Sequence, residues 1–74
     1  MSNMRTKRYV VECYPQEWDE PFKREYFEGE SDASYYAARM SLYYPRVLVI
    51  CEVYEQGWLG CVDSYTVKSI TGTL

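Results

Sequence analysis

The stretch RVLVICEVYE, residues 46–55, decides the fold of this 74-residue chain. Every second position from Val47 to Val53 carries Val or Cys, and the positions between them carry Leu, Ile and Glu. Successive side chains of a β-strand point to opposite faces, so this alternation predicts a strand. Because both rows are largely apolar, neither face resembles ordinary solvent-facing sheet.

A hairpin is expected directly after this strand. Gln56 and Gly57 form a two-residue turn, in which glycine supplies the positive φ, and the chain returns as a strand over 58–69, so that the hairpin spans 46–69. This register places Glu55 opposite Trp58 and Cys51 opposite Val62. One face is then small and branched, which suits a packed helix, and a glycine in it gives that helix room. This face consists of Val47, Val49, Cys51, Val53, Gly60 and Val62.

The opposite face of the hairpin is too apolar to remain in water. It carries Leu48, Ile50, Tyr54, Leu59 and Cys61, with only Glu52 and Asp63 plainly polar. A homodimer face is therefore predicted at Leu48, Ile50, Tyr54 and Leu59. A second subunit would also stabilise a domain this small.

A helix is predicted over 31–44, with Ser31 as its N-cap and Asp32 in its first turn. One stripe at helical spacing faces the sheet and consists of Ala33, Tyr36, Ala37, Met40 and Tyr44. Its small members let the helix lie close to the sheet. Pro45 ends the helix, because the residue before a proline is pushed out of the α region.

Two further strands are expected before the helix. Residues 7–14 alternate, with Tyr9, Val11 and Cys13 on one face, and Pro15 ends the strand. Residues 23–28 carry the charges of an edge strand, with a short helical turn as the alternative. Residues 1–6 form a flexible basic arm.

The fold class is thus α+β, in the order β-(β)-α-β-β. A small antiparallel sheet of three to four strands carries one helix on one face. The whole chain, 1–74, is a single domain.

The chain holds nine tyrosines and no histidine. Histidine is the usual proton carrier and metal ligand near neutral pH, so its absence disfavours an enzyme or a metal site, and no cofactor is predicted. Cys13, Cys51 and Cys61 lack disulfide or zinc spacing and are expected to be buried and reduced, which favours the cytoplasm. The sequence has no run of about 18 apolar residues, so no membrane-spanning segment is predicted.

Negative charge is concentrated in residues 12–32, which carry eight acidic residues against two basic ones, in a chain of net charge −3. One interpretation is a solvated loop and strand edge. The other is an acidic patch that steers the chain toward a basic partner.

The aromatic residues favour binding, because tyrosine and tryptophan are enriched in protein interfaces. Loop tryptophans ringed by charge are typical anchors. The equal alternative is that Trp18 and Trp58 cap the ends of the core. The predicted partner-binding residues are Tyr14, Glu17, Trp18, Asp19, Glu20, Tyr54 and Trp58. The alternative is a nucleic-acid-binding module that uses strand tyrosines and the basic arm, which the net negative charge disfavours.

The layout FEGESDASYYAARM…VLVICEVYEQGWLGCVD, within residues 7–68, resembles that of small phage-encoded proteins of the anti-CRISPR and host-takeover kind. That resemblance implies a non-enzymatic, stoichiometric inhibitor. Such a protein binds a host protein complex in the host cytoplasm, for example at the basic surface of a nucleoprotein complex, and blocks a site on it.

Overall fold

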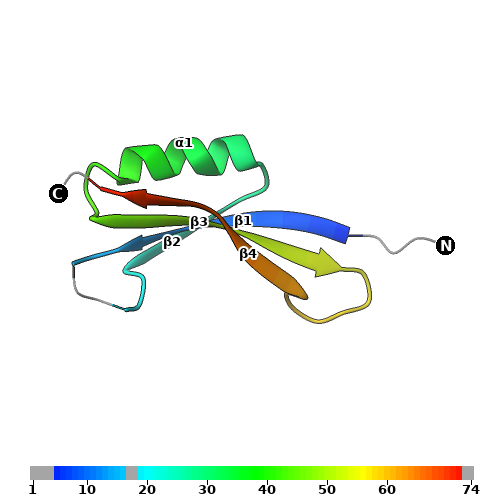
Figure 1. The fold of residues 1–74 in the computed structure, drawn as a ribbon. Coiled ribbons are helices and arrows are strands. Elements are labelled where there is room, and N and C mark those ends of the chain that lie inside the picture. The colour runs from blue at the N-terminus through cyan, green and yellow to red at the C-terminus, as the bar shows by residue number, and fades with distance from the viewer. Residues whose placement is uncertain (1–4, 17–18, 73–74) are drawn as a thin grey trace.

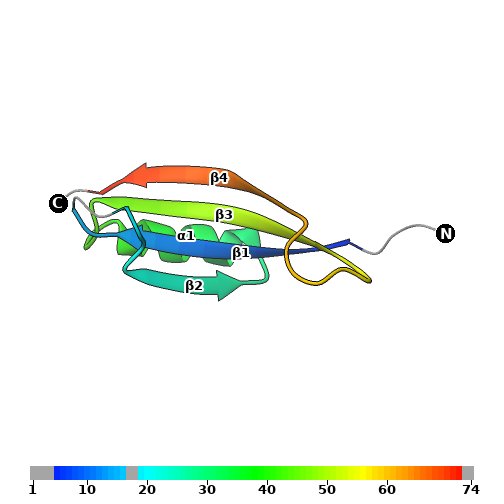
Figure 2. The ribbon, with the colours of Figure 1, turned by 90° about the horizontal axis from the view of Figure 1, so that it is seen from below.

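The stretch that dominates the sequence becomes the inner strand β3 of a four-stranded antiparallel sheet. The computed structural model describes residues 5–16 and 19–72. In chain order their elements are β1 (Arg5–Tyr14), β2 (Lys23–Phe27), α1 (Glu30–Met40), β3 (Arg46–Glu55) and β4 (Asp63–Thr71). The strands lie in the order β2-β1-β3-β4, and α1 lies across one face (Figures 1 and 2). The predicted α+β fold is therefore confirmed, and residues 23–27 form the expected edge strand.

The core lies between α1 and the face of the sheet that it covers, called here the helix face. The small side chains of Ala33 and Ala37 are fully buried against Val11 and Cys13 of β1 and against valines of β3. Tyr36, Met40 and Tyr44 pack around this cluster. The predicted helix stripe is thus confirmed for Ala33, Tyr36, Ala37 and Met40, whereas Tyr44 packs against the core from beyond the end of α1. Alanine at the centre of the stripe is what brings the helix close to the sheet.

The helix boundaries differ from the prediction. Gly29, in an extended conformation, is the N-cap in place of Ser31, and no side chain caps the first turn. The helix ends at Met40 rather than Tyr44. Beyond it the amides of Tyr43 and Tyr44 still donate to the Met40 carbonyl, so the chain unwinds through a turn before Pro45. Pro45 restricts the backbone of Tyr44, but Tyr44 lies in this turn, so the helix has already ended before the restriction applies.

The predicted register of the β3–β4 hairpin is wrong by three residues. Cys51 lies opposite Tyr65, not Val62, and Val53 lies opposite Asp63. Residues 56–62 form a seven-residue loop, so that Leu59, Gly60 and Cys61 lie outside the sheet. A two-residue turn would have placed Gly60 and Val62 on the helix face. The longer loop lets Val67 and Ile70 pack against the core instead.

A β-bulge in the β3–β4 ladder allows both ends of β4 to place apolar or aromatic side chains on the helix face. The ladder shifts between Val49 and Ile50, so that Tyr65 opposes Cys51 while Ile70 opposes Val47. Tyr65 and Ile70 are an odd number of residues apart and would lie on opposite faces of a regular strand. The extra residue turns both toward the helix face.

Two further corrections concern the cysteines and the arm. Cys13 and Cys51 are buried as expected, but Cys61 is exposed because it lies in the loop. Arg5 and Thr6, predicted in the flexible arm, are part of β1, because β3 is long enough to pair with them.

The sheet is longer than the helix that covers it. The molecule measures 49 × 24 × 14 Å, and its radius of gyration is 13.5 Å, whereas a compact chain of this length has about 11 Å. Figure 1 shows the beginning of β1, the end of β3 and the β3–β4 loop projecting past α1. This projecting part is called here the distal end. In the part of the chain that the structure describes, no helix covers either face of the sheet there.

The contact between helix and sheet can be tested by filling it. Ala37→Leu inserts a larger side chain where Ala37 has no exposed surface, and overpacking of this kind costs about 1–3 kcal/mol of unfolding free energy. Ala38→Leu, on the exposed side of the same helix, should change it by less than about 0.5 kcal/mol. Urea unfolding followed by circular dichroism measures both. Equal midpoints would contradict this packing.

Candidate protein-interaction surface

The β3–β4 loop is held at both ends by backbone hydrogen bonds. The Trp58 amide donates to the Glu55 carbonyl at 3.1 Å, and the Val62 amide donates to the Val53 carbonyl at 2.9 Å. Gly57 and Gly60 have φ values of 90° and 82°, which side chains of L-residues rarely allow. Two glycines in the left-handed region and two closing bonds therefore define the path of the loop.

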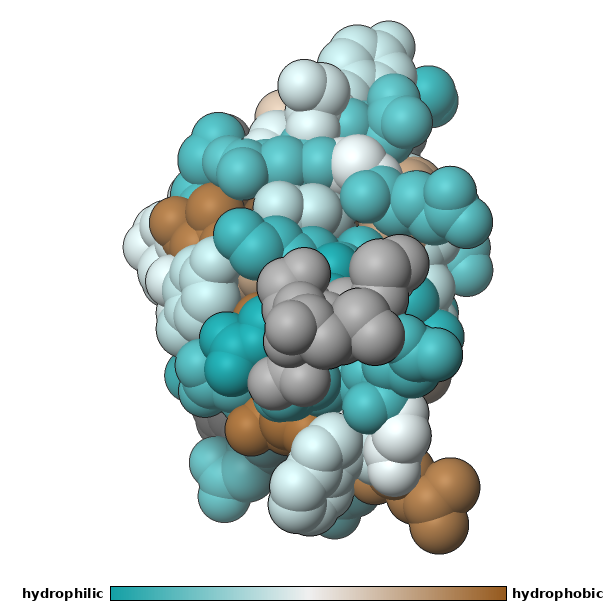
Figure 3. Space-filling view, turned by 90° about the vertical axis from the view of Figure 1, so that its right-hand side faces the viewer, coloured by the Kyte–Doolittle hydropathy of each residue, from teal (hydrophilic) through white to brown (hydrophobic). Residues whose placement is uncertain are grey.

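This loop carries its largest apolar side chains in water. Trp58 is 68% exposed, Leu59 101% and Val62 37%, and together they are called here the apolar tip. Figure 3 views the distal end and shows hydrophobic surface protruding at its lower edge, the side on which the loop lies in Figure 1. A single exposed leucine is ordinary. A fully exposed leucine beside an exposed tryptophan, on a loop with a defined path, is typical of a binding anchor.

The face of the sheet without a helix, called here the open face, carries a network of arginine, glutamate and tyrosine at the distal end. The Arg8 guanidinium donates to the Tyr54 hydroxyl at 2.6 Å and lies 3.4 Å from the Glu52 carboxylate. Tyr54 in turn donates to Glu52 at 2.6 Å. Arg8 also stacks on the ring of Tyr26, 4.2 Å from its centroid.

A second network covers the other half of the open face. Glu12 is 8% exposed, and its carboxylate accepts from the Tyr14 hydroxyl at 2.8 Å and from Arg24 at 2.9 Å. Arg46 stacks on the Tyr14 ring at 4.2 Å from its centroid. On the same face Val10, opposite Tyr26 of β2 and Ile50 of β3, is only 2% exposed although no helix covers it.

The open face is therefore not the apolar face that was predicted. Leu48 and Ile50 are half-buried, and Leu59 lies on the tip. The predicted homodimer face is wrong in including Leu59, because the hairpin register is different. Reasoning from the hairpin alone also missed the polar side chains that β1 and β2 place beside Leu48 and Ile50.

The predicted partner-binding residues do not form one surface. Tyr54 and Tyr14 lie on the open face, Trp58 lies on the tip, and Asp19 and Glu20 lie in the β1–β2 loop at the opposite end of the molecule (Figure 1). Glu17 and Trp18 lie outside the described residues. The acidic residues of segment 12–32 do not form one patch either. Glu12 is buried and paired with Arg24, whereas Glu28 directly follows β2.

Sequence reasoning missed the exposure of Leu59 and Val62. The available signal was the spacing of Gly57 and Gly60, which enclose Trp58 and Leu59. Two glycines so close together point to a loop with two left-handed positions rather than to a single tight turn.

The networks shift the pKa values of their tyrosines. The hydrogen bond to Glu52, together with partial burial, raises the pKa of Tyr54. Burial raises the pKa of Tyr14, and the bond to Glu12 raises it further against the opposing effect of Arg46 and Arg24. Burial also raises the pKa of the Cys13 thiol, which keeps this thiol neutral at pH 7.

No protein-family model, curated protein sequence or solved structure matches this chain. Within residues 5–16 and 19–72, no three metal-ligating side chains gather at one point. Over the same residues no helix has the length and apolar character to cross a membrane.

The Glu12 network predicts a loss of stability in alkali. Because the folded-state pKa of Tyr14 is raised, the unfolded chain releases this proton first. The stabilisation that the Tyr14 hydroxyl supplies is complete below about pH 10, and it is lost as the pH rises through the folded-state pKa of Tyr14. Tyr14→Phe should lower the unfolding free energy at pH 7 by about 1–3 kcal/mol, because Glu12 loses a donor.

Between pH 9 and 11, Tyr14→Phe should also lose less stability than the wild type. Urea unfolding at several pH values measures this slope, with Tyr43→Phe on the exposed surface as the control. The same slope in the wild type and in Tyr14→Phe would contradict the role assigned to the hydroxyl.

Proposed function

We propose that this chain is a non-enzymatic protein-binding module that docks through its apolar tip. The observation that carries the proposal is the complete exposure of Leu59 beside Trp58 on a loop closed by backbone hydrogen bonds. Fully burying an aliphatic side chain is worth about 1.5–3 kcal/mol. Leu59 is not buried on folding, so this free energy would be gained only when Leu59 enters a matching pocket on a partner.

The loop is suited to docking because little of it needs to become ordered. The closing bonds at Trp58 and Val62 are present before any partner binds. Ordering a mobile side chain or loop on binding opposes affinity, so a defined path favours a tighter complex.

Polar groups surround the tip as they do in protein interfaces. The Arg5 guanidinium lies 3.4 Å from the Glu55 carboxylate at the base of the loop. On the other side, the Asp63 carboxylate accepts from the Ser64 amide at 2.9 Å. An apolar centre with a polar rim is the usual anatomy of an interface between soluble proteins.

The open face supports nucleic-acid binding less well. Arg8 and Arg46 stack on tyrosine rings, where a base would have to stack. Arg8 and Arg24 also lie beside glutamates, so their charge is largely compensated before any phosphate could bind. The rings of Tyr14, Tyr26 and Tyr54 on this face are therefore already in contact with arginine side chains of the same chain.

A protruding tip that fills a pocket also excludes the pocket's normal ligand. Inhibition by occlusion is therefore the action we propose for the complex. Its stoichiometry would be one chain for each pocket, because one loop fills one site.

Two serine substitutions test the tip. Leu59→Ser should leave folding unchanged, because Leu59 contributes no buried surface, and should weaken binding to the partner by roughly 30-fold or more, as expected for an anchor. Leu42→Ser is the matched control, since Leu42 is also exposed, at 56%, but lies beyond the end of α1.

The measurement is affinity capture from an extract of the cells in which the chain acts, followed by binding of the purified candidate to each variant. A partner retained by Leu42→Ser and lost by Leu59→Ser supports docking through the tip. A partner bound equally by both variants would refute it.

A further inference from the structure

One edge of β1 is paired over only half of its length. β3 pairs with β1 from Arg5 to Tyr14, whereas β2 pairs only with the part from Tyr9 to Cys13. Figure 2 shows β1 continuing toward the distal end after β2 has turned away into α1. Residues 5–8 therefore have a neighbouring strand on one side only.

The backbone groups that face this free edge can be assigned from two hydrogen bonds. The Cys13 carbonyl accepts from the Phe22 amide, so it points toward the β2 side. The N–H and C=O of one strand residue point to the same side, and successive residues alternate. The odd-numbered residues of β1 therefore face the β2 side, and the even-numbered residues face β3.

The ladder between β3 and β4 gives the same assignment independently. The Val53 carbonyl accepts from the Val62 amide and so points toward β4. Its neighbour Glu52 then faces β1, opposite Arg8. Arg5 and Lys7 thus direct their N–H and C=O groups away from the sheet. Among the described residues, none pairs with these groups.

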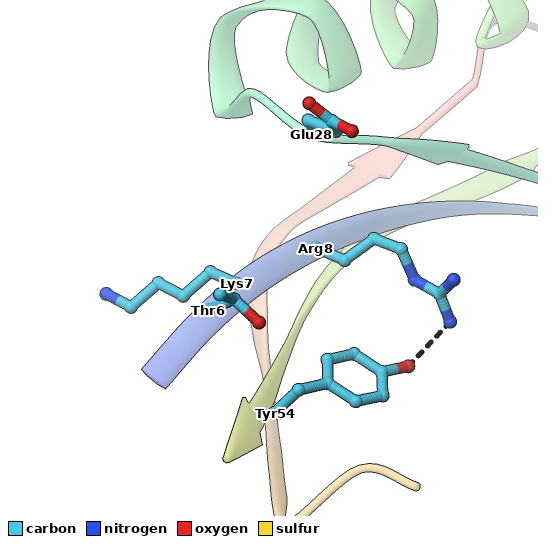
Figure 4. A pocket seen from close by; sticks show the side chains of 5 residues that line it. All are labelled: Thr6, Lys7, Arg8, Glu28 and Tyr54. Carbon is cyan, nitrogen blue, oxygen red and sulfur yellow. Dashed lines mark hydrogen bonds between the residues drawn. The ribbon is translucent and has the colours of Figure 1, made fainter. Parts of the chain in front are cut away.

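An open cavity of about 520 Å³ lies along this edge. It is lined by Thr6, Lys7, Arg8, Glu28 and Tyr54. Figure 4 shows Glu28 bordering it from the end of β2, while the hydrogen bond between Arg8 and Tyr54 borders it on the other side. The place that a longer β2 would fill is thus an open cavity, lined by residues that carry polar or charged groups.

The charge of this edge selects its occupant. Arg8 is held by Glu52 and Tyr54, and Arg5 lies beside Glu55. Lys7 has no ion pair among the described residues, and its side chain extends away from the other lining groups in Figure 4. A carboxylate on a neighbouring strand, on the same face as Lys7, would gain a cross-strand ion pair. A second copy of this edge would instead bring lysine and arginine against each other.

We propose that the free edge of β1, residues 5–8, accepts an extended acidic segment of a protein partner as an added strand. Main-chain hydrogen bonds to Arg5 and Lys7 supply affinity, and the charge of Lys7 supplies the preference for acidic residues. This inference goes beyond the apolar tip and does not depend on it.

The probe is a capped five-residue peptide, Glu-Val-Glu-Val-Glu, titrated into the ¹⁵N-labelled chain. The peptide Gln-Val-Gln-Val-Gln, which has the same shape without charge, is the matched control. The glutamate peptide should shift the amide resonances of residues 5–8 and bind more tightly than the glutamine peptide. Absence of shifts at residues 5–8, or equal affinity for both peptides, would overturn the proposal.

Two variants of one residue separate the backbone from the charge. Lys7→Ala removes the charge and should weaken the glutamate peptide by roughly 2- to 5-fold. Lys7→Pro also removes an N–H that points away from β3, a position where an edge strand tolerates proline. It should weaken binding by a further factor of roughly 2 to 10. Equal affinities of the two variants would contradict strand addition.

Arg5→Pro removes the other outward N–H and provides the same comparison with Arg5→Ala if Lys7→Pro does not fold. Leu59→Ser should bind the glutamate peptide as the wild type does. The edge and the apolar tip can therefore fail separately, because a peptide bound at residues 5–8 by Leu59→Ser depends on the edge alone.

Discussion

The ten-residue antiparallel ladder between β1 and β3 is the constraint on which the rest of the structure depends. It sets Val11 beside Val49 and Cys13 beside Val47 on the helix face, where α1 buries them beneath Ala33 and Ala37. The same register sets Arg8 beside Glu52 on the open face. Because the ladder is longer than either α1 or β2, it also creates the distal end, with its free edge and its projecting loop.

Much of the fold could be predicted because it rests on local patterns. The alternation of residues 46–55 and the alanines of the helix each specify one buried face. The register of β4 could not be obtained in this way. Gln56-Gly57 has the composition of a tight turn, and only the packing of Val67 and Ile70 against the core, with a bulge near Val49, favours the longer loop. Such a preference depends on tertiary contacts that no short window of sequence contains.

The candidate surface was predicted less well than the fold. Trp58 was predicted to be a partner-binding residue and is exposed, but Leu59 was assigned to a sheet face because the predicted register was wrong. The prediction for the open face used the β3–β4 hairpin alone. It therefore did not include the charged side chains of Arg8, Glu12 and Arg24, which come from β1 and β2. Pairing of charges across strands depends on which strands are neighbours, and that information lies in the order β2-β1-β3-β4.

Amide hydrogen exchange of the folded chain tests the central claim, that β1 is paired on both sides only between Tyr9 and Cys13. The Arg8 and Val10 amides face β3 and should exchange slowly, whereas the Lys7 amide faces the free edge and should exchange far faster than either of them. A Lys7 amide as slow as that of Arg8 would contradict the account, because it would mean that the edge of β1 is already covered.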